Sequence, residues 1–338
     1  WEYWVRLSSA DFAGSNVALE LRATAYPVNG TPRRLPPLLL YANPQSAARW
    51  VSPTGNDANN GQSAQSPVKT VQRALQLIRD AQGGTVQGGT VNLLPGNYSA
   101  VGCGFDGGPA WITIQAAPEV PVNQRESVRL IAGGDARLPS GAVRLRNITL
   151  DKIGIEGCGS SKPNIWLDNA HLIGSGSSIF YYASNLGAIY ATDGTRVENA
   201  QDAIKSAVLQ RGVEVHNILS DAFTDTQMIV NCYASGVDTT GSTLHPDILQ
   251  YNGDYSGNLI LKENLIVYGL QAYDSDAQGI FARDIRYLKD IAFVNVMIER
   301  DRALNPSAAG VSQILGADIN HLLMWNVSTN AAFNIADD

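Results

Sequence analysis

One pattern recurs through the second half of the chain: a short segment, often opened by Asn, in which apolar and polar residues alternate. Successive copies begin about 17 to 31 residues apart. Alternation with a period of two predicts strands, and copies at this spacing with variable loops indicate the coils of a solenoid. A propeller blade would be longer and more regular. The copies are Asn147–Ile155, Asn164–Ile173, Asn258–Val267, Leu288–Ile298 and Ile319–Ser328, with weaker ones at Val208–Val215 and Met228–Ala234.

The Asn residues suit the bends between strands. Asn tolerates the left-handed backbone conformation better than most residues. We expect the side chain of such an Asn to hydrogen-bond its counterpart in the next coil, which would link successive coils at the bends.

The chain before the repeats differs from them. Trp50–Gly61 predicts a short strand followed by a dense turn cluster, and Thr90–Tyr98 a strand that ends in a Pro-Gly-Asn turn. Between them, Val68–Arg79 carries apolar residues at helical spacing. We expect this helix to cover the open end of the solenoid and so prevent edge-to-edge growth. The absence of later helical patterns argues against a βαβ fold.

This succession of strand, Asn/Gly turn, capping helix and second strand resembles the beginning of β-helices in the pectate-lyase-like superfamily. The resemblance covers residues 48–338 and implies an all-β, right-handed parallel β-helix that acts on extracellular polysaccharide. It also implies a secreted or cell-surface location. Because the chain opens with Trp1 and shows no signal peptide, we expect an excerpt or processed form of a longer protein.

Residues 1–45 are predicted to form a separate β-rich linker, or the tail of an upstream β-sandwich. Val17–Tyr26 alternates like a half-buried strand, and prolines and glycines between 27 and 37 then break regular structure. We expect this segment to lie outside the coil stack, where an unpaired strand could mediate self-association or contact with adjoining domains.

Composition excludes some classes of function. The net charge is -7 and no block of Lys and Arg occurs, so nucleic acid is not an expected partner. No apolar run is long enough for a membrane span. Motifs for nucleotide binding, zinc proteases and serine hydrolases are missing. Cys103 and Cys158 both lie in Gly-Cys-Gly and are candidates for a disulfide between coils, and the alternative for all three cysteines, including Cys232, is a small buried apolar residue.

A second alignment indicates a column of carboxylates. Short segments precede the later strands, and stacking them places their first residues about 4.8 Å apart. Like charges that close raise one another's pKa unless a cation lies among them, so Asp202, Asp221 and Asp247 predict a Ca²⁺ site or acid-base chemistry. The alternative is a polar ladder at a bend. The segments are Asp202–Lys205, Asp221–Thr224, Asp247–Gln250, Gln278–Phe281 and Gly310–Gln313.

Further candidates lie beside this column. His245, two residues before Asp247, could act as a base near neutral pH, or it simply caps a turn. In polysaccharide lyases of the superfamily a Lys or Arg removes the proton beside a uronate carboxylate while a cation stabilises the resulting charge. The resemblance makes Lys205 and Arg283 the candidates for that base. Substrate-binding candidates are Gln250, Tyr251 and Phe281, and the aromatic rings among them could stack on sugars.

The leading hypothesis is therefore a lyase that cleaves an acidic polysaccharide by β-elimination, with possible Ca²⁺. The catalytic signatures of pectate lyases and polygalacturonases are not recognisable, which leaves catalysis undecided. One alternative is a glycoside hydrolase that uses two of the Asp residues. Another is a non-catalytic structural or adhesive surface β-helix that self-assembles or binds glycans.

Overall fold

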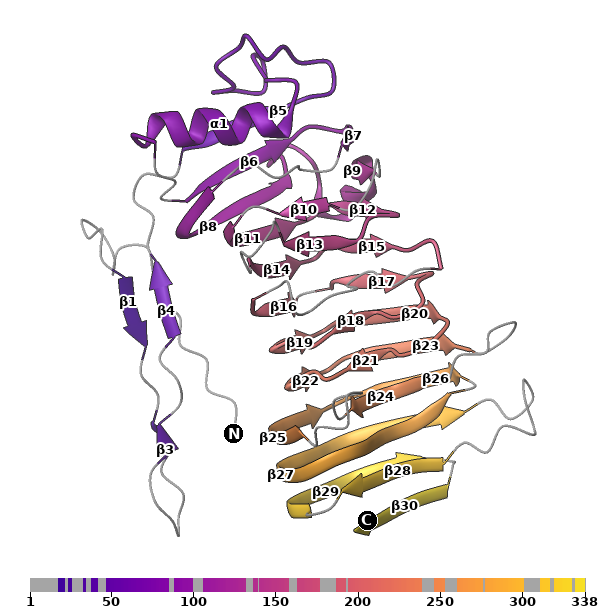
Figure 1. Ribbon diagram of the computed structural model, residues 1–338. Coiled ribbons are helices and arrows are strands. Elements are labelled where there is room, and N and C mark those ends of the chain that lie inside the picture. The colour runs from indigo at the N-terminus through magenta and orange to yellow at the C-terminus, as the bar shows by residue number, and fades with distance from the viewer. Residues whose placement is uncertain are drawn as a thin grey trace.

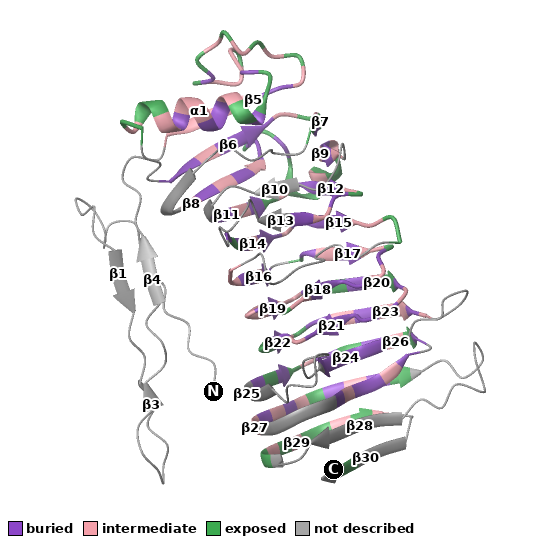
Figure 2. Cartoon of the chain, in the orientation of Figure 1, coloured by how far each residue is buried: buried purple, intermediate pink, exposed green. Residues whose placement is uncertain are grey.

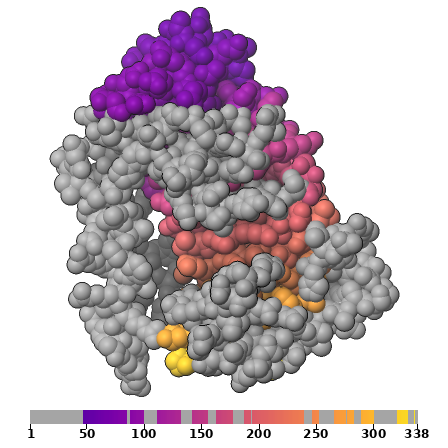
Figure 3. Space-filling view, in the orientation of Figure 1, coloured from indigo at the N-terminus to yellow at the C-terminus, as the bar shows by residue number. Residues whose placement is uncertain are grey.

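The computed structural model describes residues 47–84, 88–99, 106–131, 136–138, 140–157, 163–176, 187–192, 194–238, 246–252, 260–275, 277–300, 311–316, 319–329 and 332–337, together with four short strands nearer the N-terminus. It is an all-β parallel β-helix, with the coils stacked in chain order from α1 to β30 (Figure 1). Twenty-four of the described strands belong to one connected, hydrogen-bonded network. In the space-filling view the described residues run from the indigo cap through magenta to orange and yellow (Figure 3).

The strands stack into three faces, which we call A, B and C. The A face consists of β18 (Ile204–Lys205), β21 (Phe223–Thr224), β24 (Asp247–Asn252), the start of β27 (Gln278–Arg300), β28 (Val311–Gly316) and β30 (Ala332–Asp337). The B face consists of β5 (Ala48–Val51), β6 (Gly89–Leu93), β8 (Asp106–Ala116), β11 (Ser140–Arg146), β14 (Asn164–Asp168), β16 (Ile189–Thr192), β19 (Leu209–Arg211), β22 (Met228–Val230), β25 (Ile260–Tyr268), the middle of β27 and β29 (Ile319–Thr329).

The C face consists of β7 (Gly96–Ser99), β9 (Val128–Ile131), β12 (Thr149–Asp151), β15 (His171–Ile173), β17 (Arg196–Glu198), β20 (Glu214–Ile218), β23 (Tyr233–Val237), β26 (Gln271–Ser275) and the ends of β27 and β29. Within the same column of coils (Figure 1), β10 (Ala136–Leu138) pairs in parallel with β13 (Ile155–Gly157) as a separate two-stranded sheet.

Left-handed residues separate the B strands from the C strands. Asn147, Asn169, Gly194, Gly212 and Asn231 have φ between 50° and 83°, and later coils repeat the feature at Gly269, Asn295 and Asn326. The Asn169 side-chain amide donates to the Asn147 side-chain oxygen at 2.9 Å, and Asn326 donates to Asn295 at the same distance. The expected ladder of bend asparagines is thus confirmed at these positions.

The bends correct one sequence expectation. Asn164–Ile173 was expected to be a single strand, but Asn169 divides it into β14 and β15. The buried residues shift by one position at the bend, from Ile165 and Leu167 to Ala170 and Leu172. Because apolar residues follow closely on both sides of Asn169, the sequence pattern does not show where β14 ends and β15 begins. The segments from Val208 and from Met228 are divided in the same way, at Gly212 and Asn231.

The helix α1 (Val71–Ala81) covers the first coil, as expected, and buries Val71, Ala74, Leu75 and Ile78 (Figure 2). It begins three residues later than the apolar pattern predicts. Thr70 is its N-cap and accepts a hydrogen bond from the Arg73 amide at 3.1 Å. Val68 instead forms an isolated parallel bridge with Val51, and both are fully buried.

The interior of the solenoid is a column of apolar side chains, which Figure 2 shows as buried residues along the coils. Val91, Ile114, Leu145 and Leu167 occupy equivalent positions on successive B strands. Free Cys232 is buried among the core residues, as the small-apolar interpretation predicts, whereas Cys103 and Cys158 lie outside the described residues.

The N-terminal strands pair among themselves. β1 (Ala18–Leu21) is antiparallel to β4 (Leu38–Tyr41), and β2 (Thr24–Ala25) is antiparallel to β3 (Arg33–Arg34). In the described part of the chain, β5 is the first strand that pairs with the coils.

Candidate functional site

Strand pairing places the three predicted Asp residues at equivalent positions on successive A-face coils. Ile204 lies opposite Phe223, and Phe223 lies opposite Leu249. The Ala203 amide donates to the Asp221 carbonyl at 3.1 Å, and the Ala222 amide donates to the Asp247 carbonyl at 2.9 Å. Asp202, Asp221 and Asp247 therefore form one column.

All three carboxylates of the Asp column are buried. Asp202 and Asp221 are 3% exposed and Asp247 is 0% exposed. Since a substrate must reach a group that acts on it directly, this burial favours the polar-ladder interpretation.

Each Asp contacts the residue three positions further along its own coil. Asp202 forms an ion pair with Lys205 at 3.1 Å, Asp221 accepts from the Thr224 hydroxyl at 3.5 Å, and Asp247 accepts from the Gln250 amide at 3.0 Å. The Asp221 carboxylate also accepts from the backbone amide of Asp247 at 3.2 Å. The Asp column is thus tied both within and between coils.

The Asp column raises the pKa of its middle residue, Asp221. The pKa of Asp221 is raised from 3.8 to about 7, mainly by burial and also by the charges of Asp247 and Asp202. Lys205 and the Asp247 amide act in the opposite direction. Asp221 therefore exchanges a proton near neutral pH, which is the range that acid-base chemistry needs.

Calcium remains a prediction for this column. Within the described residues, no group of three or more His, Cys, Asp or Glu side chains is arranged to hold a metal ion. The contacts of the carboxylates with Lys205, Thr224 and Gln250 occupy oxygens that a hard cation would otherwise share.

The other sequence candidates have different surroundings. Lys205 is half-buried, and the pairing of Gln250 with Thr224 and Phe281 confirms that they share its column. Gln250 is 9% exposed, so its access to sugar is small. His245 lies outside the described residues, and of Arg283 only the backbone position in β27 is described.

Tyr251 does not take the expected role. It is 1% exposed, and its hydroxyl donates to the Thr226 carbonyl at 3.3 Å. The Thr226 hydroxyl accepts from the fully buried Gln210 at 2.8 Å. The prediction that Tyr251 stacks on sugar is wrong, because alternation along β24 turns Tyr251 inward with Leu249.

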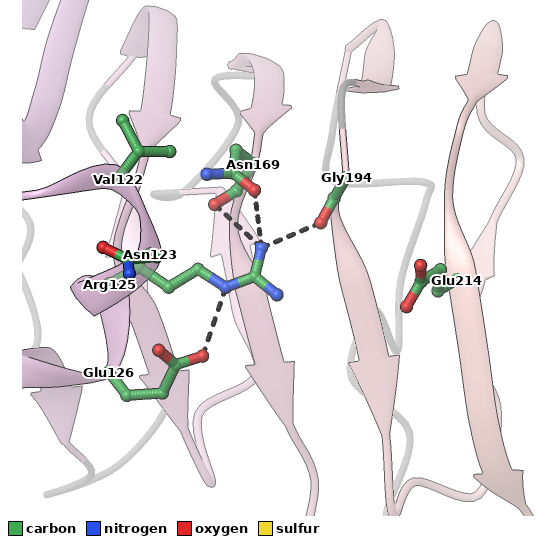
Figure 4. A pocket seen from close by; sticks show the side chains of 7 residues that line it. All are labelled: Val122, Asn123, Arg125, Glu126, Asn169, Gly194 and Glu214. Carbon is green, nitrogen blue, oxygen red and sulfur yellow. Dashed lines mark hydrogen bonds and ion pairs between the residues drawn. The ribbon is translucent and has the colours of Figure 1, made fainter.

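Sequence reasoning missed a site on the C face. The 3-10 helix η2 (Val122–Ser127) contacts β9 and β12. Beside η2 lies a hollow of about 550 Å³. Its walls come from η2, from the bend residues Asn169 and Gly194, and from Glu214 at the start of β20 (Figure 4).

Arg125 organises this hollow. One terminal nitrogen of its guanidinium donates to the Asn169 side chain at 2.7 Å and to the Gly194 carbonyl at 2.8 Å, while Nε donates to Glu126 at 3.2 Å. Among the residues drawn in Figure 4, the other terminal nitrogen carries no interaction and points to the side on which Glu214 lies. Arg125 therefore fastens η2 to two coils and presents a cationic group to the hollow.

A chain of ionisable side chains continues from Glu126 beneath η2. His171 Nδ1 lies 3.1 Å from Glu126, and Nε2 lies 3.2 Å from Glu198 without the alignment of a hydrogen bond. Arg196 completes the chain at 2.8 Å from Glu198. Burial acts to raise the pKa of Glu126, but hydrogen bonds from its own amide, Arg125 and His171 outweigh it and lower the pKa.

On the C strands that follow the hollow, aromatic side chains lie close together. The rings of His216 and Tyr233 lie 5.6 Å apart, and those of Tyr233 and Tyr273 lie 6.0 Å apart. His216 Nδ1 is 2.8 Å from the Ser235 hydroxyl on the next coil. We call the outward residues from Glu214 to Tyr273 the C-face strip. It joins a charged hollow to half-buried tyrosines.

A sequence signal for this strip was present. After each left-handed residue between a B strand and a C strand, the sequence has a polar-apolar-polar triplet. The outer two residues of the triplet face outward and the middle residue is buried. The triplets are His171-Leu-Ile173, Arg196-Val-Glu198, Glu214-Val-His216, Tyr233-Ala-Ser235 and Gln271-Ala-Tyr273, with Ile173 the exception. The position of η2 over the first of them is a tertiary feature that no local pattern indicates.

Comparison with known proteins does not assign this chain to a family or a function. No family model matches the sequence, and no curated protein is significantly similar to it. One solved structure, a rhamnogalacturonan lyase, aligns over 86% of this chain and 84% of that chain, at 14% identity and a TM-score of 0.35. A TM-score this low does not establish a shared fold. The assignment as a parallel β-helix therefore rests on the strand pairing described above. Among the described helices, none is long and apolar enough to cross a membrane.

Proposed function

We propose that this protein is a secreted or cell-surface β-helix that binds polysaccharide along the C-face strip. The carrying observation is the hollow beside η2, whose wall residue Glu214 pairs with Tyr233 on the next C strand, with the Tyr273 ring 6.0 Å beyond Tyr233. Carbohydrate sites combine aromatic rings, which pack against sugar rings, with a few fixed polar groups that set orientation. The hollow supplies Arg125, Glu126 and Glu214 as those polar groups.

An acidic polysaccharide fits the hollow through Arg125. A guanidinium pairs well with a carboxylate, and this one is already held in place by three acceptors. The neighbouring Glu126 and Glu214 suit sugar hydroxyls, which donate to carboxylates. We therefore expect uronate-containing chains to bind better than neutral chains of the same length.

Titration calorimetry with uronate-rich and neutral polysaccharides tests this proposal. Tyr233→Ala should weaken binding about fivefold, because removing one stacking ring costs on the order of 1 kcal/mol. Tyr268→Ala is the matched control: Tyr268 is 42% exposed on the B face and should leave binding unchanged. Equal weakening by both variants, or no binding by the parent protein, would overturn the proposal.

A second candidate is cleavage by β-elimination at the A face, supported by the neutral-range pKa of Asp221 beside Lys205. A base would take the proton next to the uronate carboxylate, the glycosidic oxygen would leave with a proton, and a carbon-carbon double bond would form. Lys205, His245 and Arg283 are the candidates for the base, and Ca²⁺ would stabilise the developing charge.

The ultraviolet absorbance of the unsaturated product measures this activity directly. We expect the parent protein to generate absorbance from an acidic polysaccharide in the presence of calcium, and Lys205→Ala to abolish it. New reducing ends without absorbance would identify a glycoside hydrolase instead. If neither signal appears while calorimetry shows binding, the protein is a binding β-helix without catalysis.

A further inference from the structure

Three side chains of the C-face strip are connected in series by hydrogen bonds. His216 on β20 lies opposite Ser235 on β23, and its Nδ1 atom is 2.8 Å from the Ser235 hydroxyl. The Nε2 atom of the same ring is 3.5 Å from a carboxylate oxygen of Glu214, two residues earlier on β20. A hydroxyl, an imidazole and a carboxylate are thus linked in that order.

The two partners of His216 fix the tautomer of its ring. An ionised carboxylate only accepts hydrogen bonds, so the proton of the neutral imidazole belongs on Nε2, which faces Glu214. Nδ1 is then an acceptor, and the Ser235 hydroxyl donates to it. The ring of Tyr233 lies 5.6 Å from the imidazole and limits its rotation. His216 is therefore oriented to take the proton of Ser235.

These groups are open to solvent. The side chains of Glu214 and His216 are 52% and 18% exposed, and Ser235 is half-buried. A structural hydroxyl of this solenoid behaves differently: Thr195 is fully buried and donates to the Thr192 carbonyl at 2.8 Å. A carbonyl cannot take up the proton, whereas an imidazole can. Ser235 thus combines access with a neighbouring base.

We propose that Ser235 is a nucleophile, with His216 as its general base and Glu214 as the positioning residue, and that they hydrolyse short acyl esters on sugar hydroxyls. The sugar part of the substrate rests on the function proposed above, because the same strip carries Tyr233 and the hollow. Triads of this kind are recognised by geometry and roles. A sequence motif does not indicate this one, since Ser235 is 19 residues from His216 on another coil.

Hydrolysis proceeds in two steps that need only water as co-substrate. Ser235 Oγ forms a bond to the ester carbonyl carbon, the bond from that carbon to the sugar oxygen breaks, and the Ser235 proton passes through His216 to the sugar oxygen. Water then attacks the acyl group, its proton passes through His216 back to Ser235, and a carboxylic acid leaves. Because β20 and β23 use their backbone in strand pairing on both sides, we expect weak stabilisation of the oxyanion and slow turnover.

Covalent labelling of the full chain with a fluorophosphonate, mapped by mass spectrometry, tests the nucleophile. The label should be found on Ser235, and it should form about 100-fold more slowly in His216→Gln, which lacks the base. Ser127→Ala is the matched control, because the Ser127 hydroxyl donates to the Gln124 carbonyl at 2.7 Å, and it should label like the parent protein. Melting curves check that each variant is folded. Labelling of other serines but not of Ser235 would overturn the proposal.

Hydrolysis of p-nitrophenyl acetate measures turnover without any polysaccharide. Ser235→Ala should lose the activity, and Ser235→Cys should still become acylated, since a thiol can replace the hydroxyl as nucleophile. Glu214→Gln should lower kcat about tenfold and leave KM unchanged, because the positioning charge is lost. Equal rates for the parent protein and Ser235→Ala would overturn the nucleophile, and a change in KM alone would overturn the role of Glu214.

Release of acetate from an acetylated polysaccharide identifies the substrate. The parent protein should release acetate, and Ser235→Ala should not. Hydrolysis of p-nitrophenyl acetate without release from the polymer would overturn the sugar ester as substrate while the triad stands. Binding of polysaccharide in calorimetry without either hydrolysis would overturn the triad while the proposed function stands.

Discussion

The A face and the C face both repeat polar residues from coil to coil, but the two faces treat them differently. On the A face the carboxylates of Asp202, Asp221 and Asp247 are buried and each is bound on its own coil. On the C face Glu214 is exposed and lines a hollow, and Tyr233, its partner on the next strand, is half-buried. The same solenoid register therefore builds a structural ladder on one side and an accessible surface on the other.

This difference teaches that stacking alone does not identify a functional site. Placing like residues 4.8 Å apart follows from the β-helix itself. Whether they meet solvent depends on what covers them, and η2 covers only the upper part of the C face. Substitutions to Ala in the Asp column should therefore lower the free energy of unfolding, whereas substitutions to Ala at exposed C-face positions should barely change it.

The largest effect is expected at the buried end of the Asp column. Asp247→Ala removes the acceptor for the Gln250 amide inside the protein, and should lower the free energy of unfolding by about 3 kcal/mol. Glu214→Ala, at an exposed C-face position, should change it by less than ~0.5 kcal/mol. Denaturant unfolding of both variants measures the contrast. Similar losses in both would remove the distinction between the faces.

Asp221 should make stability depend on pH. Its folded pKa of about 7 lies above the ordinary 3.8, so the folded protein holds this proton more tightly than the unfolded chain. The resulting contribution to stability is fully present below about pH 4 and is lost as pH rises through 7. Relative to the parent, Asp221→Asn should be more stable by about 2 kcal/mol at pH 8, and this gain should vanish at pH 4. Melting curves at both pH values test it; a constant difference would contradict the raised pKa.

Arg125→Ala should have an intermediate effect. It removes the bonds from η2 to Asn169 and Gly194, at an expected cost of about 1.5 kcal/mol, and it should also weaken polysaccharide binding. Arg125→Lys keeps the charge but lacks the planar fork, so it should not restore both functions. Unfolding and calorimetry on the same samples separate the two effects. Wild-type binding by Arg125→Ala would exclude the hollow from the site.

The smallest effect is expected for Asp247→Asn. The Asn side chain still accepts from Gln250 while one negative charge is removed, so stability should change by less than about 1 kcal/mol and sugar binding should not change. Melting with and without calcium completes the test. A calcium-dependent rise in Tm that Asp247→Asn abolishes would instead establish the predicted metal site.

The sequence by itself determined the repeating part of this protein. Alternation of apolar residues predicted parallel coils, and the segments from Asp202, Asp221 and Asp247 predicted their own register. Asn147 was expected at a bend, whereas the bends at Asn169, Gly212 and Asn231 were missed. The predicted features are local, and each coil contacts mainly its neighbours, so a pattern that repeats in sequence also repeats in space. The start of α1 was misplaced because Val68 has the apolar character of the helix but pairs with Val51.

Only the tertiary structure decided which surfaces are accessible. Burial of the Asp column, the inward turn of Tyr251 and the hollow beneath Arg125 all depend on contacts between segments far apart in sequence. Arg125 is 44 residues from Asn169 and 69 from Gly194. A side chain's own neighbours in sequence do not specify such contacts, because they arise from the packing of η2 against coils that the chain builds later.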